Sequence, residues 1–318
     1  MFPPRSGLYV PRVRVYFEGR LTRPFEYTVS LQRSVDGNWD LLDGFLNFRF
    51  SDAFQVRFGR TLVPYSYDWY DHLEQYFITP ERGLFPLNFG LSRAAGVLAH
   101  GDLREGRLQY AVGGFDGHAV GVADDNNIRD AVGYLNLRPF VQSEQWPGLR
   151  HLNLGGSIFG GKQIVPQQPL PLRTSLQSSE NDAAASAASA TFLEFLPGVS
   201  PLGNRAAGAL HLAWYHRQLS LESEWQAGRF QFYKLGHPGL TNLSVRGFHT
   251  TLGYFLTGET VIDRVHCDPL APPEFPGGTV RPRGHRAVRS LQPDRARLER
   301  LYRRPRQPRR IDPAGVHA

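Results

Sequence analysis

The fold of this chain is decided by the stretch AFQVRFG, residues 53–59. Its apolar residues, Phe54, Val56 and Phe58, alternate with residues that are polar or very small. A period of two is typical of a β-strand with one apolar face and one polar face. The aromatic-rich loop 62–90 follows, and a second strand-length segment, 91–103, returns from it. Because loops of this length are usually functional, we predict a barrel hairpin whose loop folds back into the barrel mouth.

The same alternation recurs through most of the first 257 residues, and strong helical periodicity is absent from them. Each alternating segment has the length of one strand, and turn residues separate most of them. We therefore predict eleven strands, at residues 12–21, 25–32, 42–50, 53–60, 91–103, 107–115, 129–140, 149–159, 206–216, 219–232 and 244–256.

The lengths of the links between these strands alternate as well. The links after the fourth, sixth and eighth strands are long, at 62–90, 116–128 and 160–205, whereas those after the odd-numbered strands are short. Short turns at one end and long loops at the other are typical of an outer-membrane barrel and not of a Greek-key sandwich. The predicted fold is thus an all-β, antiparallel, porin-type barrel. Since bacterial barrels close with an even number of strands, eleven strands indicate an incomplete barrel.

Charge divides the chain into two predicted regions. Residues 261–318 contain 13 Arg and 6 Asp or Glu, so the net charge of +7 lies there and residues 1–260 are balanced. The tail is rich in Pro and Arg and lacks alternation, which predicts a disordered basic tail after a barrel region at 1–260. A frameshift in the coding sequence is one explanation of this tail. The basic pI therefore gives no reason to expect nucleic acid as a partner of the barrel.

Several classes of protein and site are disfavoured by what the sequence lacks. A single cysteine, Cys267, cannot form an intrachain disulfide, no apolar run reaches the length of a membrane helix, and no export signal is visible at residues 1–7. No zinc-binding or nucleophile motif is present. Glu222 and Glu224 share one strand face as an acid/base pair would, but we favour a lumen wall for them. We predict no enzyme activity, no metal and no cofactor.

Residues 8–260 resemble the phosphate-selective porin O/P family of bacterial outer membranes. The likeness lies in RVRVYFEG (12–19), LLDGFL (41–46), the stretch from RFGR to PYS (57–66), RAAGV (93–97), GGFDG (113–117) and YFLTGE (254–259). Arg60 stands where the family usually has glutamine. The resemblance implies passive diffusion of anions, phosphate among them, through a barrel of about sixteen strands that lies in outer-membrane lipid as a homotrimer.

An anion path needs fixed positive charge, and arginine supplies it because its guanidinium stays protonated and binds phosphate oxygens in a bidentate way. We predict such a path from the arginines of the polar strand faces and the long loop. Alternatively, these side chains pair with Glu18, Glu26, Asp43 or Glu81. The candidates are Arg12, Arg14, Arg20, Arg49, Arg57, Arg60, Arg82 and Arg93.

The loop 62–90 contains three further candidates, Trp69, Tyr70 and Tyr76. We expect them to pack the loop against the inner wall, because buried aromatic side chains usually supply contact area. The alternative is that they contact a ligand. In that case the chain is a soluble β-rich binding protein that recognises a carbohydrate or a peptide through this loop, and this second hypothesis remains open at the level of sequence.

Overall fold

The computed structural model describes residues 13–33, 39–70, 83–117, 129–165, 168–174, 190–256, 258–263 and 267–268. All of them lie in the first of the two units, Met1–Leu270 and Ala271–Ala318, into which the chain divides. The prediction of a disordered tail concerns residues that are almost entirely outside the described part, and it stays a prediction.

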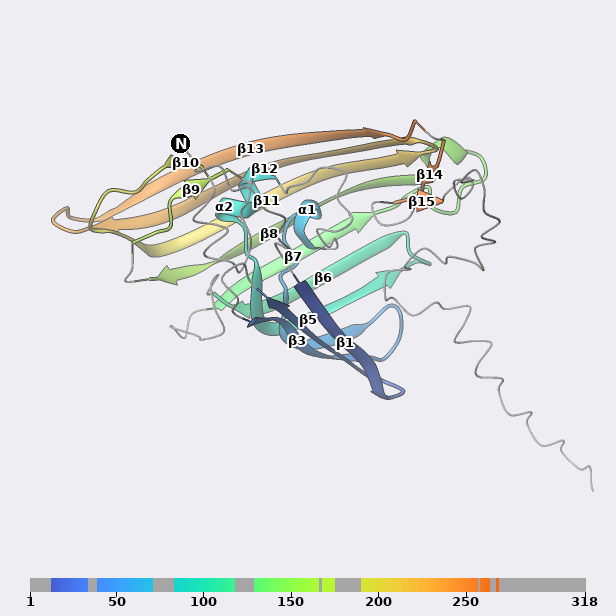
Figure 1. Cartoon of the computed structure of the whole chain (residues 1–318), viewed down its shortest axis with the longest axis horizontal. Coiled ribbons are helices and arrows are strands. Elements are labelled where there is room, and N and C mark those ends of the chain that lie inside the picture. Colours follow the sequence, from blue (N-terminus) through green and yellow to red (C-terminus); the bar gives the residue numbers. More distant parts are fainter. Residues whose placement is uncertain are drawn as a thin grey trace, which may run out of the picture. The chain divides into compact units, whose positions relative to one another are not determined.

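The main element is one antiparallel sheet of eleven strands in the order β1-β2-β3-β4-β5-β6-β7-β8-β11-β12-β13 (Figure 1). Neighbours in the sheet are neighbours along the chain, except that β8 pairs with β11. The strands are β1 (Val13–Thr22), β2 (Phe25–Arg33), β3 (Trp39–Arg49), β4 (Gln55–Leu62), β5 (Arg93–Leu103), β6 (Leu108–Asp116), β7 (Arg129–Leu137), β8 (His151–Ile164), β11 (Val199–His216), β12 (Leu219–Lys234) and β13 (Leu240–Tyr254).

This arrangement confirms the predicted fold class and the predicted number of strands. Every predicted segment corresponds to one observed strand, and the up-and-down order is that of a barrel wall. Within the described residues β1 and β13 each pair on one side only, so the sheet forms an open, incomplete ring, as the odd strand number predicts.

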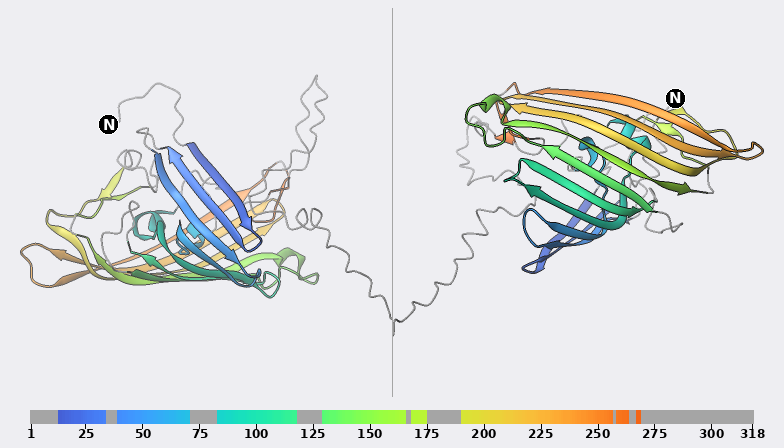
Figure 2. Two further views of the ribbon diagram at one scale, coloured as in Figure 1. Left: turned by 90° about the horizontal axis from the view of Figure 1, so that it is seen from below. Right: turned by 180° about the vertical axis from the view of Figure 1, so that it is seen from behind.

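The sheet is strongly curved, and two short helices lie on its concave side (Figure 2). Along β12, the inward-facing residues Glu222, Glu224 and Gln226 are buried, whereas Trp225 between them is exposed on the outer side. This is the alternation that a strand imposes on successive side chains.

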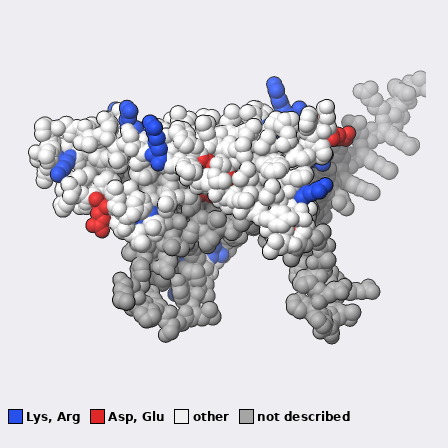
Figure 3. All heavy atoms as spheres, turned by 90° about the horizontal axis from the view of Figure 1, so that it is seen from above, with Lys and Arg blue, Asp and Glu red and all other residues white. Residues whose placement is uncertain are grey.

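The outer face is apolar over most strands. Figure 3, which views the molecule from the β13 side, shows few charged side chains on that surface. Exposed apolar side chains occur on strands across the whole sheet; they include Phe17, Leu46, Phe58, Val97, Val112, Leu135, Ile158, Leu210, Trp225, Phe248 and Leu252. No helix of the described residues is long and apolar enough to cross a membrane.

The long loops contain regular structure that the alternation could not predict. In the loop 62–90 the helices α1 (Tyr67–Tyr70) and α2 (Leu84–Phe89) form, and a turn of 3-10 helix, η2 (Pro147–Leu149), precedes β8. The pair β9 (Leu172–Arg173) and β10 (Thr191–Leu193) lies between β8 and β11. A last pair, β14 (Thr260–Val261) and β15 (Cys267–Asp268), follows β13. These elements are too short to produce a period in the sequence.

The hydrophobic core lies on the concave side, between the loop and the sheet. Tyr65 is fully buried and contacts Phe159 of β8 edge to face, with ring centroids 4.8 Å apart. Phe89 of α2 packs on Phe230 of β12 at 5.2 Å. The loop therefore contributes to the core and is attached to the wall by aromatic contacts.

Candidate functional site

The candidate site is the inner face of β1 to β5, which we call the arginine wall. It is defined by the six predicted arginines that the structure describes on these strands: Arg14, Arg20, Arg49, Arg57, Arg60 and Arg93. Alternation along β1 places Arg14 and Arg20 on one side, and the register with β2 brings them opposite Gln32 and Glu26. The local sequence pattern thus selects the face, and strand pairing selects the neighbours.

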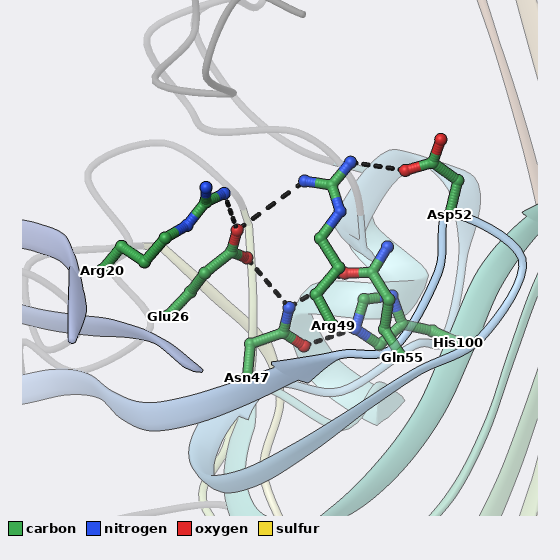
Figure 4. Close-up of polar contacts among 7 residues, drawn as sticks. All are labelled: Arg20, Glu26, Asn47, Arg49, Asp52, Gln55 and His100. Atoms are coloured by element: carbon green, nitrogen blue, oxygen red, sulfur yellow. Dashed lines mark hydrogen bonds and ion pairs between the residues drawn. The ribbon is translucent and has the colours of Figure 1, made fainter. Parts of the chain in front are cut away.

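The centre of the arginine wall is Glu26, on which two arginines converge (Figure 4). Arg20 Nη2 lies 2.7 Å from Glu26 Oε1, and Arg49 Nη1 lies 3.7 Å from the same oxygen. Arg49 also contacts Asp52 through Nη2 at 2.5 Å. All four side chains retain contact with solvent, so these ion pairs contribute little to stability. The guanidinium groups remain available to a solute.

An amide and an imidazole extend this cluster across the neighbouring strands. Asn47 donates through Nδ2 to Glu26 at 3.1 Å and to Gln55 at 2.9 Å. His100 Nε2 lies 3.0 Å from Asn47 Oδ1 (Figure 4). Asn47 and His100 were not predicted as members of the site, although both lie on polar positions of alternating strands. The alternation could have placed both side chains on the inner face. It does not give the cross-strand register, which brings them next to Glu26.

A second cluster of the arginine wall surrounds Asp43, and it is more deeply buried. Arg93 is only 2% exposed and donates through Nε to Asp43 Oδ1 at 3.0 Å. Ser30 donates its hydroxyl to the other carboxylate oxygen at 2.7 Å. Arg60, at the end of β4, is also buried. The Asp43 carboxylate thus compensates the positive charge of Arg93, which is shielded from solvent.

The remaining two members of the arginine wall have different partners. Arg14 donates through Nε to Gln32 at 2.6 Å. Arg57 donates to the hydroxyl of Thr61 at 3.0 Å, and its guanidinium carbon lies 4.2 Å from the centre of the Phe45 ring. Arg57 thus combines a hydrogen bond with a cation–π contact.

The strands β7, β8, β11 and β12 form a second wall, which we call the loop-bearing wall because the loop covers it. The loop segment 63–70 packs against it, and Trp69 is buried there. Tyr70 contacts Tyr134 of β7, with ring centroids 5.0 Å apart. Tyr67 stacks on His211 of β11 at 4.5 Å. Of the two described members of the predicted aromatic set, Tyr70 thus contacts the wall and Trp69 is buried.

Three of the predicted site residues, Arg12, Tyr76 and Arg82, lie outside the described residues, so their predicted roles remain predictions. Glu222 and Glu224 both face inward and are buried. Within the described part of the chain, no three His, Cys, Asp or Glu side chains gather in a way that could hold a metal ion. The described arrangement on the arginine wall is a set of guanidinium groups interleaved with carboxylates.

No family model and no curated protein sequence matches the chain. Among solved structures it is similar to OmpTdeltaL8, a loop L8 deletion mutant of OmpT, an outer membrane protein of Vibrio cholerae. That match has a TM-score of 0.40 and 9% sequence identity and covers 77% of this chain and 68% of that chain. A second match is the in-vitro folded, trimer form of OmpT from Vibrio cholerae, with a TM-score of 0.34 and 8% identity, covering 78% of this chain and 81% of that chain.

The class of the protein follows from its own sheet. An up-and-down antiparallel sheet with an apolar convex face, and with its buried polar and charged groups on the concave face, is the architecture of an outer-membrane β-barrel protein.

Proposed function

We propose that this chain is an outer-membrane diffusion channel that favours small anions, phosphate among them. The observation that supports the proposal is the arginine wall, which lies on the inner side of a sheet whose outer side is apolar. Arginine suits this role because it stays charged at every physiological pH and donates in a fork that matches phosphate oxygens. The proposal involves no chemical reaction.

The exposed guanidinium groups of the arginine wall support a preference for anions. The six arginines share strands β1 to β5 with five acids, Glu18, Glu26, Asp40, Asp43 and Asp102, and Arg49 also pairs with Asp52 after β3. The formal charges of these groups therefore balance, as they do over residues 1–260. The preference depends on Arg20 and Arg49, which keep 36% and 29% of their side-chain surface exposed and can attract a passing anion.

The proposal also requires closure of the sheet in the membrane. Unpaired backbone groups at a strand edge are not tolerated in lipid, so the outer edges of β1 and β13 must be paired there. The resemblance of residues 8–260 to phosphate-selective porins, and the homotrimer that it implies, belong to this proposal.

The test is ion selectivity in planar bilayers, measured with the full chain refolded from detergent. We expect the reversal potential in a KCl gradient to indicate anion preference. In the double variant Arg20→Gln with Arg49→Gln, the ratio of chloride to potassium permeability should fall by about three-fold or more, because Glu26 loses both ion-pair partners.

The matched control is Arg150→Gln, since Arg150 is an exposed arginine beside η2, outside the strands. This variant should leave the selectivity unchanged. Cation preference in the wild type, or an equal effect of the control, would contradict the role of the arginine wall. Recovery of the chain in the soluble fraction without detergent would instead support a soluble binding protein.

A further inference from the structure

One carboxylate of β12 receives hydrogen bonds from three consecutive residues of the loop. Ser66 donates its hydroxyl to Glu224 Oε2 at 2.7 Å, and the backbone N–H of Tyr67 donates to Oε1 at 2.9 Å. The N–H of Asp68 lies 3.5 Å from Oε2. Glu224 is only 2% exposed, so this carboxylate depends on the loop for its hydrogen bonds.

The backbone of the loop adopts an uncommon conformation at this contact. Ser66 has a φ of 70°, which is rare for a residue with a side chain and costs free energy unless the surroundings hold it. Its own N–H donates to the hydroxyl of Ser157 in β8 at 2.8 Å. Gln226, two residues after Glu224, donates to the Ser66 hydroxyl at 3.2 Å. Polar groups from two strands therefore converge on a single loop residue.

A second contact lies beside the first, and it is weaker. The hydroxyl oxygens of Tyr67 and Tyr215 are 3.2 Å apart, and Tyr215 donates to Glu222 at 2.9 Å. Among the described hydrogen bonds, Tyr215 connects Glu222 with the loop, whereas Glu224 accepts from the loop backbone directly. The two acids are neighbours on one row of β12 and similarly buried, so Glu222 is the matched comparison for Glu224.

Aromatic packing alone would leave the loop free to shift. Contacts such as that between Tyr65 and Phe159 supply buried area but tolerate sliding, because the hydrophobic effect has no direction. A buried carboxylate that accepts from successive donors accommodates only one placement of the backbone. Glu224 is therefore suited to position the segment, and Tyr65 is suited to stabilise it.

We infer that Glu224 is a positioning residue that latches the loop segment 63–70 onto the loop-bearing wall and thereby sets the width of the passage along the arginine wall. The inference rests on the proposed channel function for its second half only. The attachment itself follows from the hydrogen bonds and holds for any function of the barrel. Release of the latch would let the segment move into, or out of, the space enclosed by the sheet.

The experiment compares Glu224→Leu, Glu224→Gln and Glu222→Leu in the full chain refolded in detergent. Hydrogen exchange of the peptide that covers residues 63–70 measures the attachment. We expect exchange about ten-fold faster or more in Glu224→Leu, about two- to three-fold faster in Glu224→Gln, which keeps one carbonyl acceptor, and little change in Glu222→Leu. Should Glu224→Leu fail to fold, Ser66→Ala removes one donor only and should accelerate exchange by about three-fold.

Single-channel conductance in planar bilayers measures the consequence. Glu224→Leu should conduct with a larger or more variable amplitude than the wild type, and Glu224→Gln should restore an amplitude close to that of the wild type. A role in stability alone would change the yield of channels but not their amplitude.

The possible failures of the two halves are distinguishable. Unchanged exchange in folded Glu224→Leu, or an equal acceleration in Glu222→Leu, would overturn the latch whatever the protein does. Faster exchange with unaltered amplitude would overturn its influence on the passage. A wild type that does not conduct would overturn the proposed function and the second half of the inference, while the exchange data would still decide the attachment.

Discussion

The Glu26 cluster of the arginine wall and the polar groups of the loop-bearing wall arise from the same alternating pattern, yet they differ in their exposure to water. On the arginine wall, Arg20, Glu26 and Arg49 keep part of their surface in water. On the loop-bearing wall, Glu224 and Asp130 are withdrawn from water and bonded to partners far away along the chain. The first arrangement leaves charge available to a solute, and the second uses charge to hold the structure together.

The difference teaches that an inward-facing polar residue is not by itself a pore residue. A polar side chain left in contact with water contributes little to stability and can act on a passing ion. A polar side chain covered by a loop needs a hydrogen-bond or ion-pair partner, and removal of that partner lowers the stability of the fold. Four predictions test this comparison, from the largest expected effect on stability to the smallest.

The largest loss of stability is expected from Asp130→Ala on the loop-bearing wall. Asp130 is fully buried and lies 2.5 Å from Arg205 Nη2, whose side chain is itself 11% exposed. Loss of the carboxylate leaves an uncompensated, poorly hydrated cation and should lower the free energy of unfolding by about 3 to 5 kcal/mol. Urea titration of the refolded protein measures the change.

The matched change on the arginine wall is Arg20→Gln, which removes a solvent-exposed ion pair. This variant should lower the free energy of unfolding by less than about 1 kcal/mol. Equal costs for the two variants would contradict the difference that we draw between the walls.

The second prediction concerns the outer faces, on which the two walls should not differ. Leu210 of β11, 63% exposed, and Phe58 of β4, behind the arginine wall, both point outward. In lipid vesicles, Leu210→Arg and Phe58→Arg should each destabilise the protein by about 2 to 4 kcal/mol, as arginine does near the bilayer midplane. Unfolding in vesicles is the measurement.

The control for the outer face is Leu196→Arg, because Leu196 is equally exposed but lies outside the strands. This variant should change stability by no more than about 0.5 kcal/mol, as surface substitutions usually do. If the two strand variants were as harmless as the control, the outer face would not be in contact with lipid.

The third prediction concerns the backbone of the arginine wall. Gly59 has a φ of 120°, and a Cβ atom there would lie 2.3 Å from the carbonyl oxygen of Gly44. Gly59→Ala should therefore lower the free energy of unfolding by at least about 2 kcal/mol. Gly114 of β6 has no atom within 4 Å of such a position, so Gly114→Ala serves as the control and should be much milder. Comparable denaturation midpoints for the two variants would show that the close approach of β3 and β4 is not required.

The smallest change in stability is expected from Tyr65→Phe in the loop. The ring of Tyr65 is buried against Phe159, but its hydroxyl has no hydrogen-bond partner among the described residues. Removal of an unsatisfied hydroxyl should change stability by less than about 0.5 kcal/mol or increase it slightly. A large loss in thermal unfolding would indicate that the hydroxyl has a partner in the part of the chain that is not described.

Much of the fold was predictable, because alternation and turn residues are local properties. All eleven strands were predicted, and so was the sorting of their side chains into an inner and an outer row. Six of the eight predicted arginines lie on the arginine wall, while Arg12 and Arg82 lie outside the described residues. Since a period of two assigns each residue to a face, the positions of Arg14, Arg20, Arg49 and Arg57 follow from the sequence. Arg60 and Arg93 share the parity of the outward-facing Phe58 and Val97, so the alternation alone does not predict that they are buried.

The short elements and the partners were not predictable in the same way. The helices α1 and α2 are too short to show a period, and Asn47 and His100 enter the site only through the register of their strands. The importance of Glu224 was also missed, since the alternation placed it on the wall without indicating that the loop would cover it.

The sequence by itself determined that this protein is an antiparallel sheet with one wet face and one apolar face, because each strand records its two faces in adjacent residues. Only the tertiary structure decided which inward-facing groups stay in water and which are buried and bind the loop to the sheet. The hydroxyl of Ser66 and the carboxylate of Glu224 are 158 residues apart in sequence and 2.7 Å apart in space. A contact of that kind depends on how the whole sheet curves and where the loop lies, and no local pattern contains this information.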